Sequence, residues 1–176
     1  MNRTTFIELL EKRDFKTLKN TLEIMNAVDI ALLLSNLEDK ERAFAFRLIP
    51  KDKAADVFSN MSNPIQSYLV KIFTEKELRE LLDNLYMDDT VDLLEELPAN
   101  LVTRILHTVS SDKRDLINQL LKFPENSAGS IMTTEYVSLK KTMTIKETMK
   151  HIKEVGIHKE TIYCLLYTSP SPRDRG

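Results

Sequence analysis

The sequence predicts a mainly α fold: a right-handed superhelix, or solenoid, of short helices, followed by an incomplete β-α-β unit. Three observations support this prediction. Apolar residues recur every twelve positions between residues 33 and 121, helix-capping and turn residues fall between them, and the period breaks near residue 124. Apolar residues make up 42% and charged residues 30% of the 176 residues, a composition typical of globular domains.

The N-terminal stretch predicts one helix ahead of the repeats. We expect this helix over residues 4–12, because Thr5 and Glu8 have the spacing of a capping box. The repeats are then expected to begin at "NAVDIALLLSNL", residues 26–37.

The twelve-residue period defines one apolar face per helix. The last apolar positions are Leu37, Ile49, Met61, Phe73, Leu85, Leu97, Val109 and Leu121. Four positions earlier lie Leu33, Ala45, Val57, Leu69, Leu81, Leu93, Ile105 and Ile117. The residue after each of these is also apolar, except at Asn118. This i, i+1, i+4 pattern is one face of a helix of about eight or nine residues. Such helices are unstable alone, so we expect neighbours to stack, with two helices forming a 24-residue unit.

Turn chemistry separates the predicted helices. Residues 74–77, "TEKE", fit a capping box. Asn63 and Pro64 are expected to be an N-cap followed by proline at the first helical position. Pro50 and Pro98 are each expected to follow a helix end.

A second region is expected over residues 124–163, after a helical domain at 1–123. Pro124, Ser127 and Gly129 suggest a hinge. We predict strands at "EYVSL" (135–139) and "ETIYC" (160–164), with a helix between them that opens with the capping box 144–147 and runs to about residue 155. A unit of about 30 residues cannot close a core by itself, so it is expected to begin a larger domain.

The last residues, 164–176, have a linker composition and are expected to be a disordered or non-native tail. They include two prolines and two serines and resemble a translated sequencing-adapter read-through. Genuine sequence is therefore expected to stop near Tyr163.

Charge is concentrated in one segment. Residues 75–97 hold nine acidic and two basic side chains, so this segment carries −7 and the remainder +5 of the net −2. Such a field attracts cations or basic surfaces and argues against a nucleic-acid partner. Within it, "YMDDTVDLLEEL" (86–97) has five carboxylates and no basic residue.

Several classes are disfavoured. One cysteine excludes an internal disulfide and a cysteine metal site, and the three histidines lack metal-ligand spacing. No apolar run reaches the ~18 residues that cross a bilayer, and the N-terminus is too acidic for a secretory signal. We therefore expect a cytosolic chain without a membrane span. No catalytic spacing stands out, so an enzyme is not expected.

Three stretches together resemble the cytosolic part of the MgtE family of magnesium transporters: "IPKDKAADVFSNMS", "MDDTVDLLEELP" and "FPENSAGSIMTTEYVSLKKTMTIKETMKHIKEV". The resemblance covers residues 4–163. It implies an N-terminal superhelical domain followed by the start of the first of two CBS domains, with the second CBS domain and the transmembrane pore missing.

The resemblance also implies a function. In the family, Mg²⁺ ions bind between acidic surfaces of the N-terminal and CBS domains and hold the pore closed. Carried over by position, the N-domain ligands fall on Asp56, Asp88 and Asp92. The implied partners are the protein's own CBS and transmembrane domains and a second subunit in a homodimer. The parent protein would lie in the plasma (inner) membrane, with this portion on the cytoplasmic side.

Local chemistry agrees with a cation site. Asp88 and Asp92 are four residues apart and project from one helix face, opposite the apolar positions. Asp56 has the same repeat phase as Asp92, so the three could form one strip. Mg²⁺ prefers oxygen ligands and retains water. Further acidic surface could come from Asp89, Glu95 and Glu96. The alternative is a helical interaction module that docks a basic partner through residues 75–97 and senses no ion.

Overall fold

The computed structural model describes residues 3–124, 127–130, 132–156 and 159. In this part of the chain the regular structure is helical. The elements are α1 (Arg3–Glu11), α2 (Phe15–Ile24), α3 (Ala27–Ser35), α4 (Asp39–Leu48), α5 (Lys51–Ser59), α6 (Asn63–Ile72), α7 (Glu75–Asn84), α8 (Met87–Glu96), α9 (Ala99–Thr108), α10 (Ser111–Leu120) and α11 (Ile145–Val155). The mainly α fold class is confirmed.

The twelve-residue period is confirmed and extends further than predicted. Helices α1 to α10 begin at residues 3, 15, 27, 39, 51, 63, 75, 87, 99 and 111. The helices are nine or ten residues long, slightly longer than expected. The two earliest repeats had no clear apolar signal, because Arg13 and Thr21 stand where later repeats have apolar residues. Arg13 instead makes the turn after α1 with a positive φ of 53°.

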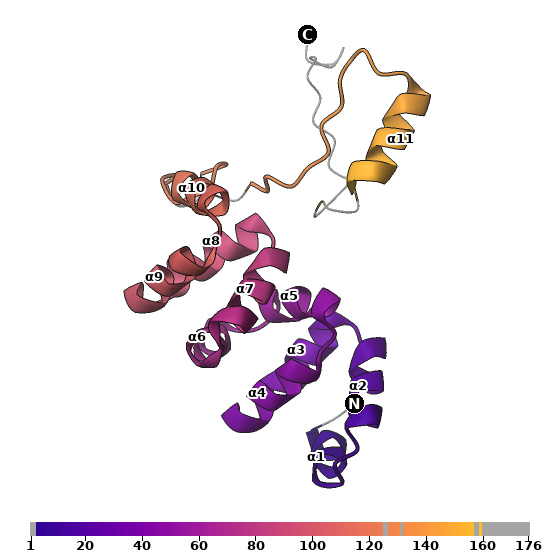
Figure 1. Cartoon of the computed structure of the whole chain (residues 1–176), viewed down its shortest axis with the longest axis vertical. Coiled ribbons are helices and arrows are strands. Elements are labelled where there is room, and N and C mark those ends of the chain that lie inside the picture. Colours follow the sequence, from indigo (N-terminus) through magenta and orange to yellow (C-terminus); the bar gives the residue numbers. More distant parts are fainter. Residues whose placement is uncertain (1–2, 125–126, 131, 157–158, 160–176) are drawn as a thin grey trace.

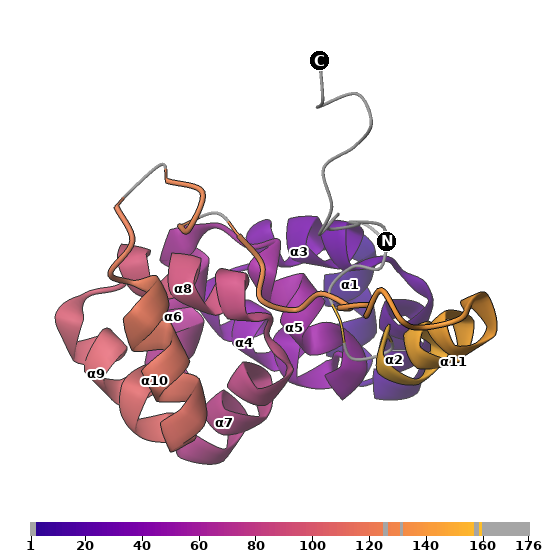
Figure 2. The same ribbon diagram turned by 90° about the horizontal axis from the view of Figure 1, so that it is seen from above.

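The helices stack in two rows. Helix α3 packs on α5, α5 on α7 and α7 on α9, while α6 packs on α8 and α8 on α10. Most helices of the stack therefore lie beside the helix two positions along the chain, as a 24-residue unit requires. Figures 1 and 2 show the stack running from α1 and α2 at one end to α9 and α10 at the other.

The core lies between the two rows. The last apolar positions are buried from Leu37 to Val109, and Leu121 packs against them half-buried. The positions four residues earlier are buried throughout, from Leu33 to Ile117. Phe46 bridges two repeats: its ring centroid lies 5.3 Å from that of Phe73 and 6.3 Å from that of Phe58.

Helix caps follow the sequence in most places. Thr74 accepts a hydrogen bond from the backbone N–H of Glu77, whose carboxylate accepts one in return, so this capping box is confirmed. Two predictions are wrong. Thr5 lies inside α1, which already includes Arg3, so it cannot be the N-cap. The N-cap of α6 is Ser62, which puts Asn63 at the first helical position.

The C-terminal region differs from the prediction in one respect. Residues 135–139 are irregular, so the predicted strand is wrong within the described chain. An isolated strand leaves its backbone groups without a ladder, and its predicted partner, residues 160–164, lies outside the described residues. The tail 164–176 also lies outside them. The capping box of Thr144 and Glu147 and helix α11 are confirmed.

Helix α11 has no buried residue, and Figure 1 shows it apart from the stack at the end of an extended segment. The hydrophobic core of the described residues contains only side chains of the stack. No described helix is both long and apolar enough to span a bilayer.

Candidate functional site

The acidic segment divides into two helices with different surroundings. Three of the four carboxylates of α7 are paired with basic residues from other helices: Glu75 with Arg104 at 2.9 Å, Glu77 with Arg47 at 2.6 Å and Glu80 with Lys51 at 2.9 Å. The Arg47 guanidinium holds the pKa of Glu77 at about 2, below its ordinary 4.5. This half of the segment is structural.

Four of the five carboxylates of α8 have no such arrangement. Within the described part of the chain, none of Asp88, Asp92, Glu95 and Glu96 forms an ion pair with a lysine or arginine. The helix begins with two aspartates in its first turn and has no basic residue in its last turn. This half is therefore the candidate site.

Asp88 is half-buried in the first turn of α8. Its Oδ1 atom is buried, and no donor among the described residues reaches it. The helix dipole favours an anion here. A buried carboxylate oxygen without a donor is nevertheless costly, and a bound cation would offset that cost.

Asp92 lies one turn further along the same face. Although the residue is exposed overall, its side chain lines a hollow between α5, α6 and α8. Partial burial there raises the pKa of Asp92, and repulsion from Asp88 and Glu96 raises it further. The structure thus brings Asp88 and Asp92 close enough for their charges to interact.

Asp56 is exposed on α5, in the other row of the solenoid. Asp56 and Asp92 are 36 residues apart, which is one and a half 24-residue units, and Asp56 does not line the hollow that Asp92 lines. Among the described residues, no group of three or more Asp, Glu, His or Cys side chains could hold a metal ion. The other predicted residues, Asp89, Glu95 and Glu96, line the same hollow as Asp92.

One further carboxylate lies at this place and was not predicted from the sequence. Glu135, in the segment that follows the solenoid, accepts a hydrogen bond at 3.1 Å from the backbone N–H of Met87, the first residue of α8. Glu135 also lies near Lys113, whose ammonium donates to the backbone carbonyl oxygens of Leu82 and Leu85. Burial lowers the pKa of Lys113, while Glu135 and Asp83 oppose this shift. The start of α8 is therefore where the C-terminal segment touches the solenoid.

These residues fit a hydrated Mg²⁺ ion. Asp88 and Asp92 offer hard oxygen ligands, and Asp88 has a buried oxygen without a described donor. Burial raises the pKa of Asp92, and repulsion from Asp88 and Glu96 raises it further. Mg²⁺ keeps several waters and commonly takes one or two protein carboxylates. The remaining ligands would come from water or from another part of the protein.

The fold and this surface define a helical-repeat protein with an acidic face at the junction to a second region. A family profile described as "MgtE intracellular N domain" matches residues 25–126. The chain belongs to the MgtE family. It is 31% identical over 173 residues to the magnesium transporter MgtE of Thermus thermophilus, and 21% identical over 165 residues to that of Bacillus subtilis.

The match covers nearly the whole chain but only part of these relatives. It includes 96% and 94% of this chain, against 38% and 37% of the two transporters. Among solved structures, the cytosolic domain of the Mg²⁺ channel MgtE in complex with ATP is 30% identical, with a TM-score of 0.82 over 92% of this chain and 66% of the other. The soluble part of a magnesium transporter, 24% identical, shares the fold with a TM-score of 0.81 over 92% and 64% of the two chains.

Proposed function

We propose that this chain is the magnesium-sensing regulatory part of a magnesium transporter or channel. The observation that carries the proposal is the contrast between α7, where three of four carboxylates pair with basic residues, and α8, where Asp88 and Asp92 have no described basic partner. We take the bound ion to be Mg²⁺ because the relatives of this chain are named magnesium transporters.

In the proposed mechanism, a hydrated Mg²⁺ ion bridges α8 to the CBS region that follows the solenoid. Asp88 and Asp92 supply the solenoid's share of the ligands, and Asp56 supplies a carboxylate to a separate part of the same interface. The ion is absent from the bridge when magnesium is scarce, and the acidic surfaces then repel each other. At ten times Kd, one ion bound only to the compact state would stabilise it by about 1.4 kcal/mol.

The contact of Glu135 with α8 supports this proposal, because it puts a carboxylate of the C-terminal region beside the proposed ligands. The partners in this proposal are the CBS and transmembrane domains of the longer protein and a second subunit in a homodimer. The parent protein would lie in the plasma (inner) membrane, with this portion on the cytoplasmic side. Its role would be regulatory rather than enzymatic, with no nucleic-acid partner.

Ion flux through the longer protein, reconstituted in vesicles, tests the proposal. We expect Asp88→Ala and Asp92→Ala to weaken closure by Mg²⁺, shifting the inhibitory concentration upward by about tenfold for a loss of 1.4 kcal/mol. The surface variant Glu11→Gln is the matched control. An unchanged magnesium dependence in both Asp88→Ala and Asp92→Ala would refute the sensing role.

A further inference from the structure

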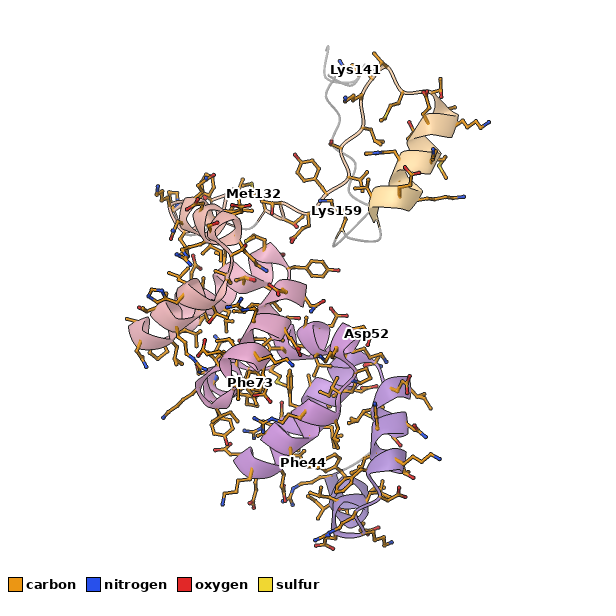
Figure 3. The ribbon with its side chains drawn as sticks, in the orientation of Figure 1. Phe44, Asp52, Phe73, Met132, Lys141 and Lys159 are labelled. Carbon is orange, nitrogen blue, oxygen red and sulfur yellow. The ribbon has the colours of Figure 1, made fainter. Side chains whose placement is uncertain are left out.

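The solenoid contains the same hollow twice, one repeat apart. The first has a volume of about 400 Å³ and lies beside Phe73, which is labelled in Figure 3, between α4, α5 and α7. The second has a volume of about 290 Å³ and lies between α5, α6 and α8. Of the eleven residues that line the first, ten have their counterpart twelve positions later among those that line the second. The two hollows therefore form an internal comparison within one chain.

In the first hollow, basic side chains neutralise the carboxylates. Arg47 donates to Glu77 at 2.6 Å, and the Lys51 ammonium lies 2.9 Å from a carboxylate oxygen of Glu80. The pKa values of both carboxyl groups are lowered, in each case chiefly by the hydrogen bond from the basic partner. The first hollow therefore accommodates basic side chains paired with its carboxylates.

The second hollow keeps the carboxylates but not the basic residues. The counterparts of Glu77, Glu80 and Asn84 are Asp89, Asp92 and Glu96, whereas the counterparts of Arg47 and Lys51 are Ser59 and Asn63. A carboxylate has thus been added where the first hollow has an amide, and both cations have been replaced by neutral side chains. The raised pKa of Asp92, caused by burial and by Asp88 and Glu96, is the opposite of the lowered pKa of Glu80.

A buried amide in the second hollow gives an independent indication of a ligand. Gln66 is only 7% exposed and lines the hollow. Its Nε2 donates to the backbone carbonyl oxygen of Phe58 at 2.9 Å, while no donor from the described residues reaches its side-chain carbonyl oxygen. An acceptor in such a place is expected to have a donor. A ligand with N–H groups would supply one.

The shape and walls of the second hollow favour a basic side chain over a bare metal ion. Phe58, Met61 and Leu93 contribute apolar wall, which suits the methylene stem of arginine or lysine beneath its charged head. A guanidinium has five N–H donors in a planar fork that can bind carboxylates and an amide oxygen together. In the described chain, no three of the acidic side chains are placed to hold a metal.

We infer that the hollow between α5, α6 and α8 binds an arginine side chain from a partner polypeptide segment, in the manner that Arg47 and Lys51 occupy the preceding repeat. The arginine head contacts Asp92 and Glu96, and its stem lies against Phe58 and Leu93. This inference does not rest on magnesium sensing, which uses Asp88 on the start of α8. The two sites share only Asp92.

Nuclear magnetic resonance of the ¹⁵N-labelled 176-residue chain, titrated with N-acetyl-Gly-Arg-Gly-amide, tests the inference. We expect saturable shifts confined to the amides of residues 58–66 and 89–96, with a Kd on the order of 1 mM for a single partly exposed charged contact. The uncharged peptide N-acetyl-Gly-citrulline-Gly-amide is the matched probe and should bind at least about tenfold more weakly.

Two variants separate this site from the magnesium proposal. Glu96→Gln leaves Asp88 and Asp92 in place and should weaken arginine-peptide binding about threefold to tenfold. The double variant Ser59→Arg/Asn63→Lys installs the basic residues of the first hollow and should abolish the shifts while raising the thermal midpoint. The inference is overturned if the citrulline peptide binds equally well, if the double variant still binds, or if only MgCl₂ produces these shifts.

Discussion

At the scale of single residues, the surroundings of a carboxylate decide its role in this protein. Glu77 and Asp92 belong to consecutive acidic helices, yet the pKa of Glu77 is lowered to about 2 and that of Asp92 is raised. The difference comes from Arg47, which reaches Glu77, and from the partial burial of Asp92, to which repulsion by Asp88 and Glu96 adds. Sequence composition showed one acidic segment, whereas the structure distinguishes three carboxylates of α7 that pair with basic residues from four of α8 that form no ion pair within the described residues.

Removing the charge of Glu77 should destabilise the fold. Its lowered pKa means that the ionised form favours the folded state, so this contribution is complete above the ordinary value of 4.5 and is lost as pH falls toward 2. We expect Glu77→Gln to lower the free energy of unfolding at pH 7 by about 1 kcal/mol, because the ion pair with Arg47 is lost while the amide oxygen can still accept from the N–H of Thr74. Urea unfolding at pH 7 and pH 3 measures this. The exposed carboxylate variant Glu23→Gln should change little, and equal losses in both variants would contradict the role of Arg47.

Removing the charge of Asp92 should have the opposite effect. Because its pKa is raised, protonation favours the folded state, and this contribution to stability diminishes as pH rises through the titration of Asp92. Asp92→Asn should therefore raise the free energy of unfolding at pH 7 by about 0.2–0.5 kcal/mol per relieved like-charge pair. The gain should disappear at low pH, where Asp92 is already protonated. Asp115→Asn on α10 is the control, and a destabilised Asp92→Asn would show that this charge is compensated.

At the scale of elements, the ends of the short helices are satisfied by side chains from later repeats. At the C-terminal ends of three helices, a cationic side chain donates to two backbone carbonyl oxygens, and the two oxygens occupy the same positions of the repeat each time. The pairs are Arg42 with Leu34 and Leu37, Arg104 with Val70 and Phe73, and Lys113 with Leu82 and Leu85. Helices of nine or ten residues leave a large share of their carbonyls unpaired at the C-terminus. These cations thus supply hydrogen bonds that the helices cannot make internally.

Arg42 is the most buried of these cations, at 8% exposed, and also pairs with Asp39 at 2.6 Å. Arg42→Met keeps the apolar stem but leaves the carbonyl oxygens of Leu34 and Leu37 without this donor. We expect a loss of about 2–4 kcal/mol in the free energy of unfolding. Thermal and urea unfolding measure it against the exposed variant Arg79→Met, and a loss below 1 kcal/mol would show that water replaces the guanidinium.

Glu135 links the C-terminal segment to α8 through the N–H of Met87. Removing this cap with Glu135→Ala should cost about 1 kcal/mol locally, which corresponds to about fivefold faster hydrogen exchange at the first amides of α8. Lys140→Ala in the same segment is the control. Unchanged exchange at α8 in Glu135→Ala would mean that the contact contributes nothing to holding the helix.

At the scale of the whole molecule, the repeat was predictable and the contacts across it were not. The apolar period identified the solenoid because every later repeat keeps an apolar residue at the same positions, and it missed the first two repeats where Arg13 and Thr21 interrupt the pattern. The strand at 135–139 was wrong because strand formation depends on a partner, not on local propensity alone. The carbonyl-binding cations and Glu135 join residues up to 48 positions apart, so only the stacking geometry reveals them.

The candidate site was likewise predictable from the sequence only in part. Asp88 and Asp92 were predictable as neighbours, because four residues is one helical turn. Their placement relative to Asp56 depends on the two-row stacking, and the strip expected for all three residues stays a prediction. The handedness of the superhelix and the domain boundaries at residues 123 and 163 remain predictions.

The central claim is that Mg²⁺ bound by Asp88 and Asp92 holds α8 against the domain that follows it. Hydrogen exchange of residues 86–97 in the longer protein, with and without millimolar MgCl₂, tests this most directly. The account predicts that Mg²⁺ slows exchange across this segment at least fivefold in the natural protein and not in Asp88→Asn/Asp92→Asn, while α3 is unaffected in both. Equal protection in the double variant, or none in the natural protein, would contradict it.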